Sequence, residues 1–352
     1  MIPLTRFIHF YLLKKIMAYT FLPFALVLLA SIFQGSFGLG MKFMAPLKWE
    51  SWWLVHATVA MFLIPMVWAM VVVPNLFDVI AQAPSDSILE GMLFGAFWGI
   101  GGIMFGKSIP YIGISLTYGI VMGICSIAGS LIPFFSIENA TNLSAFPYVI
   151  GGVFFMLIGV AFTAYAGILR DKITKVKSDV KINLKAGLII AFLSGLLSAA
   201  LSVGFDKGKS IGVLAETAGA LTRNSSLAIW VVVLWGGYVV NAGYAIFLLF
   251  KNNTWNSFRV ANSGKAYMWA ILASVFWFGA LGIYGQGAIL MGTMGSVIGW
   301  PILLGVSLIV SNLWAYLNKE WQGAGKSFSY LLMGLFILIL ATTVLGYANS
   351  VN

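Results

Sequence analysis

Residues 94–124 read FGAFWGIGGIMFGKSIPYIGISLTYGIVMGI, and this apolar stretch decides the fold class. Its glycines at Gly95, Gly99, Gly102 and Gly106 are four, three and four residues apart, so they share one face of a helix. In water, glycine costs about 0.8–1.0 kcal/mol relative to alanine in a helix interior. Inside a bilayer, small residues are instead favoured where two helices pack. The stripe therefore predicts a close helix–helix contact in a membrane protein.

The composition of the whole chain also indicates an integral membrane protein. Of its 352 residues 61% are hydrophobic and 9% are charged, with a mean hydropathy of +0.97. An ordinary soluble domain has about 25% charged residues. The net charge of +10 would favour nucleic-acid binding in a soluble protein, but here the basic residues lie between apolar runs. Such residues orient helices and face anionic lipid, so we expect the lipid bilayer as a partner and no nucleic acid.

The residues that usually hold metals or cofactors are scarce. Cys125 is the only cysteine and lies in an apolar run, while His9 and His56 are the only histidines. Neither a Walker A motif nor H-E-x-x-H occurs, and the glycines of residues 99–102 lack the strand–turn–helix context of a dinucleotide loop. We therefore expect no metal site, no cofactor and no enzymatic catalysis.

Ten apolar segments have the length that a membrane requires. About 20 helical residues cross the hydrocarbon core, which is about 30 Å thick. The segment after Lys15 stays apolar and lacks a small-residue cleavage site, so we interpret it as a retained helix rather than a signal peptide. The chain is thus predicted to be an all-α polytopic membrane protein with spans over residues 19–41, 52–73, 88–109, 111–135, 148–169, 186–205, 227–250, 266–290, 296–317 and 328–348.

The basic residues are distributed unevenly between the two sides of these spans. Loops after the odd-numbered spans hold 14 of the 20 lysines and arginines, which predicts that those loops are cytoplasmic and both termini are not. Arg6, Lys14 and Lys15 favour the opposite orientation. Two explanations stay open: either the chain starts at Met17, or residues 1–18 form an N-terminal extension or interfacial segment.

The two halves of the chain resemble each other. Phe97 and Trp98 are echoed by Phe276 and Trp277, and the pattern Gly113, Ile120, Gly123 recurs 182 positions later. Five crossings reverse the direction of the chain, so two such halves form an inverted repeat, which in transporters places the substrate near the midplane. We expect a first repeat over residues 19–169, a basic cytoplasmic loop over 170–185, a second repeat over 186–348 and a tail over 349–352.

Polar and aromatic side chains at membrane depth are the candidates for a substrate site. Polar groups are expensive there, so each must pair with another group or line a wet cavity. Amides donate and accept, which suits the hydroxyls of a polyol, although an amide can also simply join two helices. The candidate amides are Gln34, Asn241, Gln286 and Asn312, and the aromatic candidates, which could stack on a sugar or only fill space, are Trp98, Trp277 and Tyr284.

Proton coupling would need a titratable group that both sides can reach. The candidates are His56, Glu90 and Asp206. Histidine has an ordinary pKa of about 6.5, but His56 is about one turn from the predicted span end, which favours a solvated interfacial position. Asp206, which is next to Lys207, could instead be half of a loop salt bridge. Trp52 and Trp53 and the other tryptophans at span ends are predicted to anchor the interface.

Several motifs along the chain form a recognisable set: FGAFWGIG at residues 94–101, YIG at 111–113, SGLLSAALS at 194–202, GG at 236–237 followed by Asn241 and Gly243, and KEWQGAGK at 319–326. This set resembles the L-rhamnose/proton symporter family of the drug/metabolite transporter superfamily. The resemblance covers nearly all of the chain after about residue 19. It implies ten helices in two inverted repeats and proton-driven uptake of a deoxyhexose, and it makes Trp98 and Asn241 the best candidates to contact sugar.

The sequence thus favours a multi-pass transporter of a bacterial inner membrane that imports a neutral deoxyhexose, L-rhamnose, by proton symport. Two alternatives stay open: an exporter of a metabolite or drug on the same fold, and a sensor or scaffold that transports nothing. In the favoured interpretation the glycine stripe is a seam beside Trp98 that lets the halves rock. Leucine at Gly99 or Gly102 is then expected to block transport without preventing insertion.

Overall fold

Ten helical segments in the computed structural model are long and apolar enough to cross a membrane, as the sequence predicts. The structure describes residues 21–174 and 183–351, and these ranges contain no strand. The expected N-terminal segment over residues 1–18 lies outside them, as does the middle of the basic loop. The spans are Phe21–Phe43, Trp49–Val72, Ser85–Ile112, Ile114–Phe135, Phe146–Ile173, Leu184–Thr217, Thr222–Lys251, Gly264–Leu290, Gly292–Leu317 and Lys326–Ser350.

Most spans are single α-helices, and the exceptions lie at their ends and in the second span. The second span consists of two α-helices joined by a π-helical turn, an arrangement that is frequent at functional sites. The elements are η1 (Phe37–Phe43), α2 (Trp49–Ala57), η2 (Thr58–Leu63), α3 (Ile64–Val72), α4 (Leu76–Gln82), α5 (Ser85–Ile112), α6 (Ile114–Phe135), η3 (Ala140–Asn142), α7 (Phe146–Ile173), α8 (Leu184–Lys207), α9 (Lys209–Thr217), α10 (Thr222–Lys251), η4 (Trp255–Arg259), α11 (Gly264–Leu290), η5 (Gly292–Met294), α12 (Gly295–Leu317) and α13 (Lys326–Ser350).

The third and fourth spans form a hairpin, and its turn at Gly113 lies three residues beyond residue 110, where the predicted spans were separated. Helix α5 continues through Lys107 and Pro110 and ends at Ile112. Gly113 then has a φ of 80°, and α6 begins at the next residue. Glycine adopts positive φ without steric cost, so Gly113 makes the sharp reversal and proline only occupies the last helical turn. Helix α7 likewise runs on to Ile173, so the basic loop begins later than residue 170.

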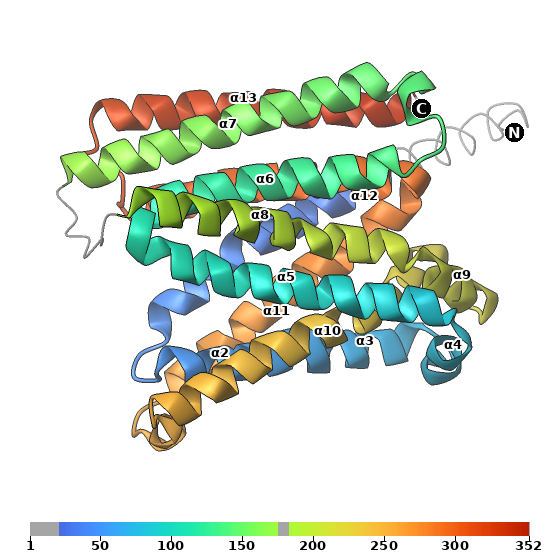
Figure 1. Cartoon of the computed structure of the whole chain (residues 1–352), viewed down its shortest axis with the longest axis horizontal. Coiled ribbons are helices and arrows are strands. Elements are labelled where there is room, and N and C mark those ends of the chain that lie inside the picture. Colours follow the sequence, from blue (N-terminus) through green and yellow to red (C-terminus); the bar gives the residue numbers. More distant parts are fainter. Residues whose placement is uncertain (1–20, 175–182, 352) are drawn as a thin grey trace, which may run out of the picture.

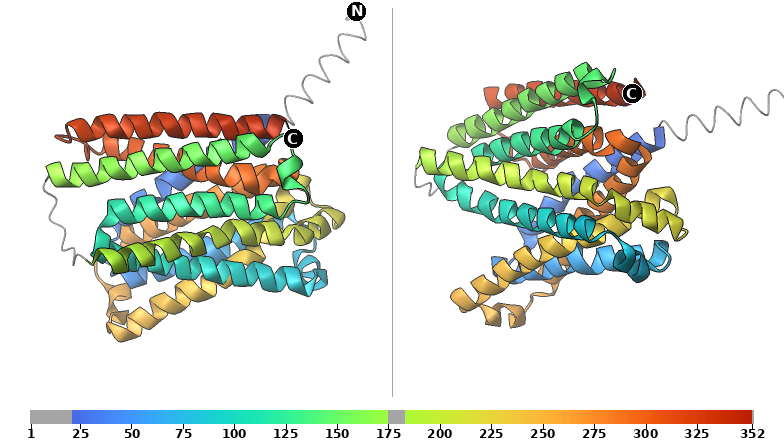
Figure 2. Two further views of the ribbon diagram at one scale, coloured as in Figure 1. Left: turned by 45° about the horizontal axis from the view of Figure 1, so that its top comes forward. Right: turned by 45° about the vertical axis from the view of Figure 1, so that its right-hand side comes forward.

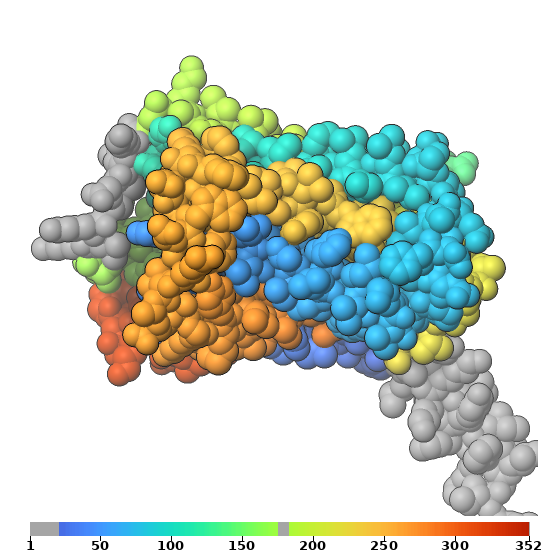
Figure 3. Space-filling model, turned by 90° about the horizontal axis from the view of Figure 1, so that it is seen from below, coloured from blue at the N-terminus to red at the C-terminus, as the bar shows by residue number. Residues whose placement is uncertain are grey.

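The helices lie side by side along the long axis of the molecule (Figures 1 and 2). Helices α7 and α13 pack together as an outer layer, α6 and α8 lie beneath them, and α5 packs between α8 and α10. Helix α12 is the most buried of the spans. Seen from below, α10 lies between α5 and the second span (Figure 3). This last arrangement brings spans two, three and seven together.

One end of the bundle collects the basic residues. Lys42, Lys107, Arg170, Lys251 and Lys319 lie at the ends of the odd-numbered spans or in the connections that follow them. We call this the basic end. It is the left-hand end of Figure 1, and α4 and α9 are at the opposite end. Because consecutive spans run in opposite directions, the connections that follow the odd-numbered spans lie at the same end of the molecule. Their basic residues therefore give this end its positive charge.

The glycine stripe on α5 packs along only half of its length, which corrects the expectation of one continuous seam. A Cβ at Gly95 would overlap the Val233 carbonyl of α10, and one at Gly99 would lie 2.9 Å from the Val240 Cβ. Gly102 and Gly106 would meet nothing within 4 Å. Helices α5 and α10 therefore touch in the half away from the basic end and diverge towards it (Figure 1).

Candidate functional site

A cluster of aromatic side chains joins the second, third and eighth spans. The ring centroids of Trp98 on α5 and Trp277 on α11 are 5.4 Å apart, and that of Trp277 is 6.3 Å from the His56 imidazole. The His56 ring is 5.2 Å from the Trp53 ring on the same helix. Trp53 then donates a hydrogen bond from Nε1 to Asn241 Oδ1 of α10, at 3.1 Å. These five residues, Trp53, His56, Trp98, Asn241 and Trp277, are called the central cluster.

Two glycines allow this cluster to close. A Cβ at Gly237 would lie 2.9 Å from the Trp98 ring, and one at Gly99 would lie 3.1 Å from Asn241 Nδ2. The Asn241 amide itself donates to the Gly237 carbonyl at 2.9 Å. Glycine at both positions therefore gives Trp98 and Asn241 room to pack closely against the neighbouring backbone.

The central cluster offers apolar surfaces and hydrogen-bonding groups without a permanent charge. Three indole faces can contact C–H surfaces, and the amide and imidazole can exchange hydrogen bonds. One of the two Nδ2 hydrogens of Asn241 bonds to the Gly237 carbonyl, and Oδ1 retains a second lone pair beside the one that accepts from Trp53. Such a site suits a small, neutral, hydroxylated molecule.

His56 is not solvated, contrary to the sequence prediction, and Trp53 bonds to Asn241 of α10. His56 is 0% exposed, and Trp52 beside it is also buried. Helix α2 begins at Trp49, so His56 lies about two turns inside it rather than one. Helices α10 and α11 pack against α2, and the Phe37 ring of η1 lies 6.0 Å from the His56 ring. The spacing of three residues between Trp53 and His56 was the available signal, since it places them on one helix face.

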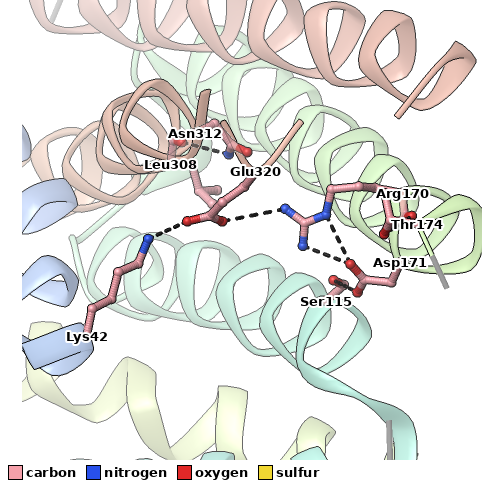
Figure 4. A network of polar contacts seen from close by, with 8 residues as sticks. All are labelled: Lys42, Ser115, Arg170, Asp171, Thr174, Leu308, Asn312 and Glu320. Carbon is pink, nitrogen blue, oxygen red and sulfur yellow. Dashed lines mark hydrogen bonds and ion pairs between the residues drawn. The ribbon is translucent and has the colours of Figure 1, made fainter. Parts of the chain in front are cut away.

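The remaining aromatic and amide candidates lie apart from this cluster in their contacts. Tyr284 is fully buried against aromatic rings, which makes it part of the core, and Gln286 two residues on is 8% exposed. Asn312 donates to the Leu308 carbonyl of its own helix at 2.9 Å, near the basic end (Figure 4). Gln34 has its Oε1 buried without a partner among the described residues. The rings around Tyr284 are Phe205, Trp230 and Trp300.

The two carboxylate candidates form ion pairs at the end opposite the basic end. Glu90 is 3.6 Å from Lys207 Nζ, and Asp206 is 2.5 Å from Lys209 Nζ. Asp206 at the end of α8 thus pairs with the first residue of α9, Lys209, across Gly208. Ser296 of α12 also donates to Asp206 at 3.2 Å. Both carboxylates thus tie neighbouring helices together.

Comparison with known proteins identifies the family. The model of the family described as "L-rhamnose-proton symport protein (RhaT)" matches residues 21–350. The chain belongs to this family. It is 28% identical over 319 residues to the L-rhamnose-proton symporter of Yersinia pestis (strain Pestoides F), covering 86% of this chain and 92% of that protein. It is 27% identical over 331 residues to the L-rhamnose-proton symporter of Cronobacter sakazakii, covering 88% and 94%.

Membership of the L-rhamnose-proton symport family makes the chain a multi-pass membrane transporter and not an enzyme. The structure shows the role of KEWQGAGK, one of the motifs by which the sequence resembles this family. The motif forms the connection between α12 and α13 at the basic end. Its Glu320 and Trp321 both contact Arg170 of α7: Glu320 at 3.8 Å from Nη1, and the Trp321 ring at 4.9 Å from Cζ.

A network of charges surrounds that contact (Figure 4). Glu320 also accepts a hydrogen bond from Lys42 of η1, at the end of the first span. Arg170 donates to Asp171 Oδ1 from Nε at 3.0 Å and from Nη2 at 2.8 Å, and Ser115 of α6 donates to Asp171 Oδ2 at 2.8 Å. The network therefore ties the first, fourth and fifth spans to the connection before the last.

Arg170→Lys is expected to lower the melting temperature of the purified protein in detergent by about 2–4 °C. A loss of about 1 kcal/mol in the free energy of unfolding produces a shift of this size in domains of about 150–250 residues. Lysine keeps the charge but cannot donate the pair of hydrogen bonds to Asp171 or stack on Trp321. Lys172→Ala on the same helical turn, where the side chain is exposed, is the control and should shift the melting temperature less. Equal shifts would show that the network contributes nothing to stability.

Proposed function

We propose that the chain imports L-rhamnose together with protons across a bacterial inner membrane. The family and the relatives in Yersinia and Cronobacter support this direction and this substrate. The observation that carries the proposal is the central cluster, which places three indoles, an amide and an imidazole between spans two, three, seven and eight. A 6-deoxyhexose presents a methyl group and C–H faces to the indoles and hydroxyls to the polar groups.

Each member of the cluster has a distinct role in this proposal. Trp98 and Trp277 stack against the apolar surface of the sugar, as aromatic rings do in sugar-binding pockets. Asn241 exchanges hydrogen bonds with hydroxyls while Trp53 holds its amide in place. Gln34 and Gln286 are supporting candidates from the first and eighth spans, because each carries an amide at membrane depth.

We further propose that residues 19–169 and 186–348 are inverted repeats that rock against each other. Supporting this, spans that would correspond to each other pack together: α6 with α12, α7 with α13, and the second span with α10. A two-fold axis between the halves brings such mates into contact. The basic end would face the cytoplasm, and the divergence of α5 and α10 there would be the route by which sugar leaves.

The test is uptake of radiolabelled L-rhamnose into proteoliposomes containing the purified protein, with and without an inward proton gradient. We expect uptake that rises with the gradient and alkalinisation of the medium when rhamnose is added. An exporter would give no sugar-induced alkalinisation, and a sensor or scaffold would give no uptake. Absence of gradient-dependent uptake of rhamnose and of related deoxyhexoses would reject the proposal.

A further inference from the structure

We propose that His56 binds the coupled proton, and that it does so as part of the wall of the sugar site. This inference rests on the proposed function and adds to it the identity of the proton-binding atom.

The carboxylates of the described residues are all near helix ends. Glu50 and Asp86 are the second residues of α2 and α5, Glu90 is the sixth residue of α5, and Asp206 is the last but one of α8. The others are in short helices, in connections or in the last turn of α7: Asp78, Glu138, Asp171, Glu216 and Glu320. His56 is therefore the group inside a described span whose ordinary pKa lies nearest to neutral.

The hydrogen bonds of His56 define which nitrogen is free. Ser274 Oγ on α11 is 2.8 Å from the Ala270 carbonyl and 3.1 Å from His56 Nδ1. A hydroxyl has one proton, and the shorter contact to the carbonyl takes it, so the Ser274 oxygen accepts from Nδ1–H. The neutral ring then carries its lone pair on Nε2, which is buried and has no partner among the described residues. Nε2 is the proton-accepting atom.

The surroundings of His56 can hold a cation without a carboxylate. Its ring is 5.3 Å from that of Trp52 with an interplanar angle of 14°, and 6.0 Å from that of Phe37 on η1. Trp53 and Trp277 complete the enclosure. Aromatic faces attract cations, and the attraction is strongest in desolvated sites. Protonation of Nε2 gives an imidazolium in which both ring nitrogens carry a hydrogen. Release of the Nε2 proton restores the neutral ring.

No charged side chain is among these contacts, whether from α2 itself, from η1 or from α11. The charged residue of α2 nearest in sequence is Glu50, whose carboxylate accepts hydrogen bonds from Thr254 at 2.5 Å and Asn252 at 3.1 Å. These partners hold it against the end of α10 rather than beside the imidazole. With no charged neighbour among these contacts, the charge on His56 depends on whether Nε2 holds a proton. Bound sugar can change how readily Nε2 holds that proton, because Trp53 and Trp277 contact His56 and also belong to the sugar site.

The experiment compares wild-type protein with His56→Gln in proteoliposomes loaded with a pH-sensitive dye. A gradient of about one pH unit supports about tenfold accumulation for one proton per sugar. Wild-type protein should show that dependence and rhamnose-induced proton uptake. In His56→Gln, any remaining rhamnose movement should be independent of the gradient and carry no protons. Glu90→Gln and Asp206→Asn are the controls, and both should keep coupled uptake.

A direct measurement covers the case in which His56→Gln fails to fold or to move sugar. Because the chain has two histidines, His9→Gln leaves His56 as the only one, and its ring can be followed by nitrogen NMR after labelling with ¹⁵N-histidine. We expect the Nδ1–H tautomer at high pH, and a larger protonated fraction when rhamnose is added at constant pH. An Nε2–H tautomer, or a ring that does not respond to rhamnose, would overturn the assignment.

The two proposals fail differently. Coupled uptake by His56→Gln equal to that of wild type overturns the role of His56 and leaves rhamnose import standing. Absence of rhamnose uptake by the wild-type protein in every condition overturns the proposed function, and the role of His56 with it.

Discussion

Gly95→Ala is expected to abolish recovery of folded protein, whereas Gly102→Ala on the same face of α5 should leave folding intact. A Cβ at position 95 would overlap the Val233 carbonyl, a backbone atom that cannot rotate away. At position 102 the added Cβ meets nothing within 4 Å. Alanine is favoured over glycine in helix interiors in general, so the opposite outcome at Gly95 comes from the contact with α10 alone. Overpacking typically costs about 1–3 kcal/mol, and more where backbone must move.

The measurement is size-exclusion elution and melting temperature of each variant after extraction into detergent. Gly236→Ala provides a reciprocal test from α10, because its Cβ would overlap the Met92 carbonyl of α5. It should behave like Gly95→Ala. Similar yields and melting temperatures for Gly95→Ala and Gly102→Ala would contradict the packing described here.

The same contrast revises the expectation for leucine in the stripe. The sequence alone suggested that Gly99→Leu and Gly102→Leu would both block transport. In the structure, a side chain at Gly99 would strike Val240 and the Asn241 amide, whereas Gly102 is exposed between diverging helices. Loss of transport is therefore expected at Gly99 through the central cluster. Gly102→Leu should fold, and its effect on uptake reports whether sugar passes that opening.

Asn241→Leu is expected to reduce L-rhamnose uptake by about tenfold to a hundredfold. Leucine has a similar size but cannot accept the hydrogen bond from Trp53 or donate to the Gly237 carbonyl. An unpaired buried donor costs about 1–3 kcal/mol, which corresponds to that range of affinity. The sugar would also lose the polar group that we assign to its hydroxyls.

Asn312→Leu is the matched control for this prediction. It removes the same amide from another span, but among the described residues Asn312 bonds only to Leu308 of its own helix, and it lies near the basic end. Its uptake should stay within about twofold of wild type, since a single own-helix hydrogen bond is worth about 1 kcal/mol or less. Initial rates of radiolabelled uptake at equal protein density measure both variants. Equal losses would argue against a special role for Asn241.

Some features of the central cluster were accessible from the sequence and others were not. Trp98, Asn241 and Trp277 stood out because each is an amide or an indole far from a span end, where it is expensive or unusual. Trp53 and His56 were misplaced because the predicted second span began three residues late. That error moved His56 towards the interface, although the bundle encloses it.

Local composition determined the ten spans, the basic end and the polar groups at membrane depth, because the free energy of insertion depends on each segment almost independently. Which residues meet depends on how each helix is rotated and tilted, and neighbouring helices set both. Only the tertiary structure therefore brought Trp53 to Asn241, 188 residues away, and joined them to Trp98 and Trp277 through His56. For the same reason only the structure divided the stripe at Gly95, Gly99, Gly102 and Gly106 into a packed half and an open half.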